Sequence, residues 1–235
     1  MPDGRRERFL FMKDYSIKKD TDKKHIILAL SGGIDSGMSI GMLKRGGWKK
    51  IYAANHVVAD GIKSSSTEVL ERARTLCEKE GIPFYIIEAQ KKFSECVIDN
   101  FIERYGKALT PNPCVICNET LKFSWFYDAV LEKIRKEEKI SGDEKVFFAT
   151  GHYARIVEKD GMLFIARGKD RQKDQSYMLY RLPQSILERI VFPMGELYKK
   201  DLPPEAEKLG YSFEAVRESQ DICFIEGDYG DYIVS

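Results

Sequence analysis

Ile26-Ile-Leu-Ala-Leu-Ser-Gly-Gly-Ile-Asp-Ser36 is the stretch of this sequence that decides the fold. It opens with consecutive apolar residues, a pattern typical of a strand that is buried on both faces of a parallel sheet. The glycines then allow a tight turn, and a helix is expected through Leu43, ending at Gly46-Gly47. Because the free N–H groups at a helix start attract anions, the turn predicts an anion-binding loop.

The same alternation of strand and helix continues along the chain. Further strands are predicted at residues 51–56, 84–87 and 146–150, and helices at residues 66–81, 93–105 and 119–138. In the last helix Trp125, Ala129 and Ile134 are expected to face inward. Strands separated by such helices predict right-handed crossovers and an α/β Rossmann-like fold, a parallel sheet with helices on both faces. A small β-hairpin is expected around Lys159-Asp-Gly161, and the chain after Asp174 is expected to be mostly helical until its last segment.

Three informative segments begin at the carboxyl ends of predicted strands. They are the loop of residues 31–36, the residues after His56, and Gly151-His152. In open parallel sheets, ligands bind in the crevice beyond these ends. We therefore expect one active site there.

Composition points to a cytoplasmic protein that has no membrane partner. The chain has 235 residues and a formal net charge of +1, its apolar runs are too short to span a bilayer, and its charged N-terminus has no signal-peptide core. Five cysteines, with Cys114 and Cys117 separated by two residues, favour reactive thiols or metal ligands over disulfides. Cys77 and Cys96 lie on predicted helical faces and are expected to fill the core.

The loop of residues 31–36 lacks the Gly-Lys-Ser/Thr ending of a Walker A motif. Instead, Ser31-Gly-Gly-Ile-Asp-Ser36 resembles the pyrophosphate-binding loop of the ATP pyrophosphatases. Four more segments follow in order: Thr110-Pro-Asn-Pro-Cys-Val-Ile-Cys-Asn118, Ala149-Thr-Gly-His-Tyr153, Lys173-Asp-Gln-Ser-Tyr177 and Ser219-Gln-Asp-Ile-Cys-Phe-Ile225. With all five, the chain resembles the tRNA-specific 2-thiouridylase family over nearly its whole length, which implies an adenine nucleotide alpha hydrolase-like version of the Rossmann-like fold.

The resemblance implies ATP and Mg²⁺ as cofactors. Asp35 would assist through Mg²⁺, and His56 falls where the family usually has Met near the adenine, although a partly buried strand histidine is an equal alternative. The residues that the resemblance assigns to ATP are Ala29, Leu30, Ser31, Gly32, Gly33, Ile34, Asp35, Ser36 and Gly151.

The resemblance also implies a uridine of tRNA as the acceptor. Transfer of AMP onto a carbonyl oxygen creates a leaving group that a sulfur nucleophile displaces, and the base must be flipped out of its stack. Cys117 matches the first catalytic cysteine, and Cys223 matches the cysteine that carries a persulfide. The sulfur would come from a donor protein or from inorganic sulfide. The residues that match contacts to the base or the tRNA are Asn112, Pro113, His152, Lys173, Asp174 and Gln175.

Cys114 departs from the family, which commonly carries Asp at this position. With Cys117 and Cys223 it places three thiols around one site. Three cysteines with an open fourth position suit a 4Fe–4S cluster whose unique iron could hold a sulfide. A redox pair and half of a zinc site are the alternatives for a lone Cys-x-x-Cys. The cluster is favoured over the persulfide route because Cys114 has no role in the latter.

Length is the second departure, since the family's chains continue past Ser235 into a linking domain and a β-barrel that help to grip tRNA. We expect residues 1–24 to form a charged tail, residues 25–182 the catalytic domain, and residues 183–235 a helical extension that carries the last cysteine. One alternative is adenylation of a small molecule or free nucleobase. Another is a non-catalytic iron–sulfur or zinc-binding module.

Overall fold

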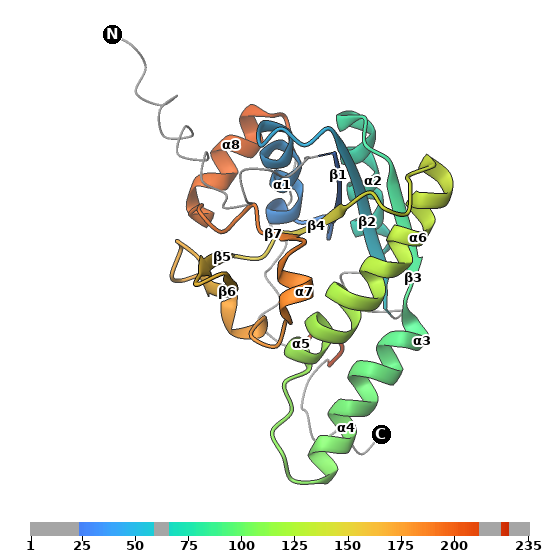
Figure 1. Ribbon diagram of the computed structural model, residues 1–235, viewed down its shortest axis with the longest axis vertical. Helices are drawn as coiled ribbons and strands as arrows, with labels where there is room; N and C mark the ends of the chain where they lie inside the picture. The colour runs from blue at the N-terminus through green and yellow to red at the C-terminus, as the bar shows by residue number, and fades with distance from the viewer. Residues whose placement is uncertain (1–23, 59–65, 212–221, 226–235) are drawn as a thin grey trace.

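A five-stranded sheet is the centre of the computed structural model, which describes residues 24–58, 66–211 and 222–225 (Figure 1). Its strands lie in the order β3-β2-β1-β4-β7, and every neighbouring pair is parallel. The predicted α/β Rossmann-like fold is therefore confirmed. The strands are β1 (His25–Ala29), β2 (Lys50–Val57), β3 (Phe84–Glu88), β4 (Val146–Thr150) and β7 (Ile190–Val191).

Helices cover both faces of the sheet, and for this reason its central strands are largely apolar. These helices are α1 (Ile34–Arg45), α2 (Thr67–Glu80), α6 (Tyr127–Glu138), α7 (Gln184–Leu187) and α8 (Leu202–Lys208). Helices α1, α2 and α8 enclose a core with Ile26 and Leu28 of β1, whereas α6 and α7 pack over Ile27 (Figure 1). Alternate residues of one strand thus anchor the two helical layers.

Local signals fixed several element ends as predicted. Ser66 caps α2 by accepting a hydrogen bond from the Val69 N–H at 3.4 Å, and Gly81 ends this helix at φ 63°, a left-handed conformation that glycine adopts easily. The predicted hairpin is formed by β5 (Ala154–Lys159) and β6 (Met162–Arg167), which pair antiparallel. Its turn residues Asp160 and Gly161 both have positive φ, as a type I′ turn requires.

The long helix predicted at residues 119–138 begins earlier, at Pro113, because α5 (Pro113–Ile116), a π-helical segment η4 (Cys117–Phe126) and α6 run on without a break. The π-helical segment uses i→i+5 hydrogen bonds and so shifts the phase of the inward face. Ile134 is fully buried, as predicted. Phe126 and Val130 are also buried, whereas Trp125 and Ala129 are only half-buried, which corrects the prediction for these two residues. A second composite helix is built from α3 (Gln90–Phe93), η3 (Ser94–Ile98) and α4 (Asp99–Gly106).

The expectation of a mostly helical chain after Asp174 is wrong for the described residues. The helical elements after Asp174 are short and are separated by irregular chain. They are the single-turn 3₁₀ segment η5 (Ser176–Met178), then α7, then the 3₁₀ segment η6 (Lys199–Asp201), then α8. Strand β7 forms an edge of the main sheet, where Ile190 pairs with Phe148. Met194, which follows β7, is completely buried. The described part of residues 183–235 is therefore built into the same core as residues 25–182.

Two further expectations, the charged N-terminal tail and the lack of a membrane span, can be compared only with the described residues. The charged tail predicted at residues 1–24 lies outside it except for Lys24. Among the helices of the described ranges, none combines the length and apolar character needed to cross a membrane.

Candidate active site

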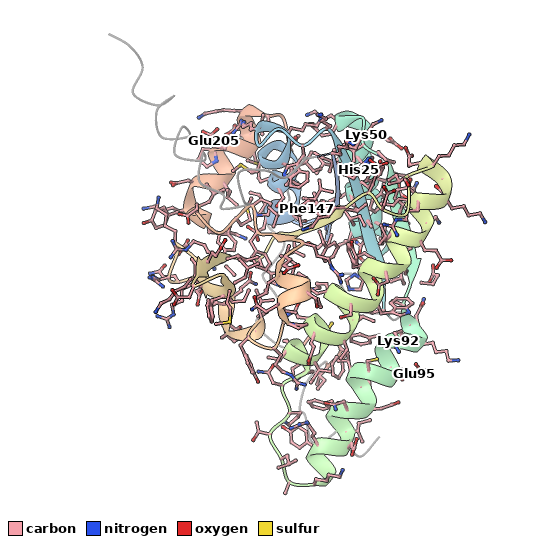
Figure 2. The ribbon with its side chains drawn as sticks, viewed as in Figure 1. His25, Lys50, Lys92, Glu95, Phe147 and Glu205 are labelled. Carbon is pink, nitrogen blue, oxygen red and sulfur yellow. The ribbon has the colours of Figure 1, made fainter. Side chains whose placement is uncertain are left out.

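A cavity of about 380 Å³ lies beyond the carboxyl ends of β1, β2 and β4, where the sequence predicts the site. Figure 2 shows His25 and Lys50 at the amino-terminal ends of β1 and β2, the opposite end of the sheet. The η4 segment, η5 and residues 222–224 close the cavity from outside the sheet. The residues predicted for the site that line it are Ala29, Leu30, Ser31, Asp35, Ser36, His56, Pro113, Cys114, Cys117, Gly151, His152, Gln175 and Cys223.

The loop of residues 31–36 is held closed by one serine. The Ser36 hydroxyl accepts a hydrogen bond from the Ser31 N–H at 3.1 Å, lies 3.1 Å from the Ser31 hydroxyl, and donates to the Gly33 carbonyl at 3.1 Å. Gly32 has φ +72°, and a Cβ there would lie only 2.7 Å from the Val69 carbonyl oxygen of α2. Gly32, Gly33 and Ile34 therefore shape the loop without lining the cavity.

Asp35, in the first turn of α1, is engaged at both carboxylate oxygens. The Tyr153 hydroxyl donates to Oδ1 at 2.7 Å, and the Lys199 ammonium donates to Oδ2 in an ion pair. Gly151 brings the end of β4 against the same helix start, because a Cβ at Gly151 would lie 3.0 Å from the Ser36 nitrogen. Neither Tyr153 nor Lys199 was predicted as a site residue.

Of the two site histidines, His152 is buried and His56 is half-buried, and both have a lowered pKa. Burial, helped by the nearby charge of Lys122, lowers the pKa of His56 to about 3. The same two causes hold the pKa of His152 well below its usual value, and its Nδ1 lies 2.6 Å from the Thr150 hydroxyl. Both rings can therefore offer a hydrogen bond to a base or an adenine without carrying charge.

Three of the five cysteines line the cavity: Cys114, Cys117 and Cys223. Burial raises the pKa of the Cys117 thiol to about 11, although Lys122 acts in the opposite direction. Cys114 and Cys223 are exposed residues, and partial desolvation by the surrounding protein raises the pKa of each thiol. Neither Cys77 nor Cys96 lines the cavity. Cys77 is buried in a hydrophobic core, as predicted, whereas the half-buried Cys96 packs in the cluster that also contains Cys117.

The three thiols were also predicted as ligands of a 4Fe–4S cluster. Across the described ranges, no three side chains among His, Cys, Asp and Glu form a group that could hold a metal ion. The thiols thus share a cavity but are not arranged as a metal site. As they stand, these residues do not fit a bound metal centre.

Lys122 is a cavity residue that the sequence pattern did not reveal. It follows Cys117 by five positions, and in a regular α-helix with 3.6 residues per turn these two side chains point in different directions. The π-helical geometry of η4 brings residue i+5 back over residue i. Only a signal for the π-helical segment itself could have placed this cation beside the thiols.

Three predicted acceptor residues do not line the cavity: Asn112, Lys173 and Asp174. The Asn112 side chain caps α5 by accepting a hydrogen bond from the Val115 N–H at 3.2 Å. The Asp174 carboxylate accepts the Gly168 N–H at 2.9 Å and the Ser176 hydroxyl at 2.8 Å. In this structure the Asn112 and Asp174 side chains therefore stabilise local backbone next to the cavity-lining residues Pro113 and Gln175.

Comparison with known proteins adds one family and several relatives. The family model described as "tRNA methyl transferase HUP domain" matches residues 24–227. The chain is 39% identical over 212 residues to the tRNA-specific 2-thiouridylase MnmA of Syntrophotalea carbinolica, and 42% identical over 211 residues to MnmA 2 of Clostridium botulinum. Each alignment covers 88% of this chain but only 56% and 57% of those relatives, so the chain spans little more than half of their length.

Two solved structures are more distant neighbours. The U34-tRNA thiolase NcsA from Methanococcus maripaludis, solved with its [4Fe-4S] cluster, is 18% identical with a TM-score of 0.46, covering 85% of this chain and 61% of that one. The NH3-dependent NAD synthetase from Campylobacter jejuni is 18% identical with a TM-score of 0.40, covering 88% of this chain and 72% of that one.

Proposed function

The chain belongs to the tRNA methyl transferase HUP domain family, and we propose that it uses ATP to adenylate a uridine carbonyl oxygen in tRNA and then replaces this oxygen with sulfur. One observation carries the proposal. The glycine-rich loop of residues 31–36 and three cysteine thiols open into the same cavity. A phosphate-binding loop beside sulfur nucleophiles is what consecutive adenylation and sulfur transfer require.

Adenylation is the first step. The uridine oxygen attacks the α-phosphorus of ATP while the N3 proton passes to solvent, and the bond from the α-phosphorus to the bridging oxygen breaks with its electron pair on pyrophosphate. The N–H groups at the start of α1 face the anion, and the helix dipole favours negative charge there. Asp35 is the loop carboxylate that would hold Mg²⁺, a hard cation that prefers oxygen ligands and shields phosphate charge.

Sulfur transfer is the second step, and two cysteines suffice for it. The terminal sulfur of a Cys223 persulfide attacks the adenylated carbon, and AMP leaves with the electron pair of the broken C–O bond. The Cys117 thiolate then attacks the Cys223 sulfur, so that the thiolated base leaves and a Cys117–Cys223 disulfide forms. A thiol reductant restores both thiols, and a sulfur-donor protein supplies the next persulfide sulfur.

The acceptor base would enter from the rim formed by Pro113, His152 and Gln175, all of which line the cavity. A neutral His152 can hydrogen-bond a uracil edge, and the apolar Pro113 and Met178 can contact its faces. A base reaches such a pocket only after it leaves its stack in the RNA. This geometry supports a flipped-out uridine as the acceptor.

The cluster route makes a different demand on the same thiols. A 4Fe–4S cluster on Cys114, Cys117 and Cys223 would leave none of them free for a persulfide, and inorganic sulfide would then be the donor. Because the thiols are not arranged as a metal site, no step is derived from the cluster. Iron and acid-labile sulfide assays on anaerobically purified protein, with visible spectra, separate the two routes.

The function is tested with purified protein, ATP, tRNA and a persulfide donor, by chromatography of the phosphate products and mass spectrometry of nucleosides. We expect pyrophosphate and 2-thiouridine from the wild type, and neither product from Asp35→Ala. Cys117→Ala and Cys223→Ala should each lose thiolation about as completely as the double variant, since residues that act as a unit are non-additive. Cys77→Ala is the control, because Cys77 lies in a separate hydrophobic core and does not line the cavity, and it should thiolate normally. Orthophosphate as the primary product, or normal thiolation by Cys117→Ala, would refute the proposal.

A further inference from the structure

The phosphate loop contains no cation of its own. Residues 31–36 include no Lys or Arg, and their ionisable side chain is the carboxylate of Asp35. A triphosphate brings several negative charges to this carboxylate. The loop therefore needs positive charge from elsewhere in the chain.

Lys199 places an ammonium group at the loop, although it lies 164 positions from Asp35 along the chain. Its Nζ pairs with Asp35 Oδ2, and its side chain is 20% exposed. A cation at a helix N-terminus works against the helix dipole. The Lys199 ammonium is therefore favourable at this place only when an anion balances its charge. In this structure the anion is the Asp35 carboxylate, and a phosphate of bound ATP could take its place.

The backbone that carries Lys199 is fixed by buried contacts. The Lys199 N–H donates to Asp170 Oδ2 at 2.9 Å, and Asp170 is only 9% exposed. The Gly195 carbonyl accepts the Lys169 N–H at 2.8 Å, and a Cβ on Gly195 would lie 2.1 Å from the Ala154 carbonyl oxygen. Because the backbone is held in this way, the long side chain can exchange one anion for another without moving the fold.

We infer that Lys199 is a catalytic residue that binds the β- and γ-phosphates of ATP and neutralises the pyrophosphate as it leaves. The inference rests on the proposed function. As the bond between the α-phosphorus and the bridging oxygen breaks, its electron pair stays on the pyrophosphate, and the Lys199 ammonium stabilises this charge. Asp35, released from Lys199, is then free to hold a cation of its own.

A purely structural ion pair between α1 and η6 is the competing explanation. Partly exposed pairs of this kind contribute little to stability, and such a pair would affect all nucleotides alike. A phosphate contact affects ATP but not AMP, which lacks the β- and γ-phosphates. The difference between the two nucleotides therefore separates the explanations.

The test measures dissociation constants of ATP and AMP by calorimetry for the wild type, Lys199→Met and the neighbouring exposed control Lys200→Met. Losing one charge-assisted contact should raise the dissociation constant of ATP by about tenfold or more. The dissociation constant of AMP should stay within about twofold of the wild-type value, because AMP lacks the phosphates that Lys199 contacts. Lys200→Met should bind both nucleotides as the wild type does. Lys199→Gln, which can still donate to Asp35, is the second neutral variant if Lys199→Met does not fold.

Lys199→Met could weaken ATP binding indirectly, by leaving the Asp35 carboxylate unpaired beside the phosphates. The background variant Asp35→Asn removes this repulsion. If Lys199 contacts the phosphates, Lys199→Met still weakens ATP binding in the Asp35→Asn background. Equal ATP affinity with and without Lys199 in that background would overturn the inference, as would equal losses for ATP and AMP. A wild type that does not bind ATP at all would instead refute the proposed function.

Discussion

Replacing Gly32 by Ala tests whether the phosphate loop depends on close packing against α2. Gly32 has φ +72°, and a Cβ would lie 2.7 Å from the Val69 carbonyl oxygen and 3.0 Å from Val69 Cγ1. The left-handed backbone alone costs an alanine about 1–2 kcal/mol, and contact with a backbone oxygen cannot be relieved by a side-chain rotation. We expect Gly32→Ala to lose about 2 kcal/mol or more of unfolding free energy.

Gly33→Ala is the matched control within the same loop. Gly33 has φ −88°, and its added Cβ would meet only the Ser31 hydroxyl at 3.7 Å, an ordinary contact. In urea denaturation, with an m value of about 2–3 kcal/mol/M, the Gly32→Ala midpoint should fall by roughly 0.7–1 M while that of Gly33→Ala stays near the wild type. Equal midpoints for the two variants would refute the packing argument.

Two further predictions concern pH. Burial raises the pKa of Glu80, but hydrogen bonds from Lys44 at 2.6 Å and Tyr211 at 2.5 Å outweigh it and hold the pKa below its usual value. This stabilisation is present above the unfolded-state pKa of about 4.3 and is lost as pH falls through the folded value. In urea titrations the wild type should therefore lose its advantage over Glu80→Gln on acidification, and parallel pH profiles would contradict the ion pair. For His56, burial and Lys122 lower the pKa to about 3, so the folded state resists protonation and stability declines as pH falls below the unfolded value of about 6.5. Its ring resonances in NMR should not titrate between about pH 8 and 5, and a midpoint near 6.5 would show an exposed ring.

The parallel sheet and the location of the site could be predicted because their signals are local. The apolar run at Ile26, the cap at Ser66 and the turn at Gly161 each act over a few residues. The cavity follows from these signals, because the carboxyl ends of parallel strands meet at one edge. The main sheet order, by contrast, is set by packing between distant segments.

The parts that could not be predicted depend on geometry without a local signal. Trp125 was expected inward because the α-helical period was assumed, and the π-helical segment η4 changed this phase. Lys199 meets Asp35 only after β7 and η6 are packed against the sheet, so neither periodicity nor a motif indicates the pair. The edge strand β7 has two residues, too few to distinguish from a loop by pattern alone.

Tyr153 joins the two halves of the cavity through a single side chain and its own peptide groups. Its hydroxyl holds Asp35, whereas its backbone N–H and carbonyl bond the side chain and the N–H of Gln175 at 3.0 and 2.9 Å. Under the proposed function, a shift at Gln175 on acceptor binding would be transmitted through Tyr153 to Asp35. Thermodynamic reciprocity then sets a strict rule: by whatever factor the acceptor tightens ATP binding through this tyrosine, ATP tightens acceptor binding by the same factor.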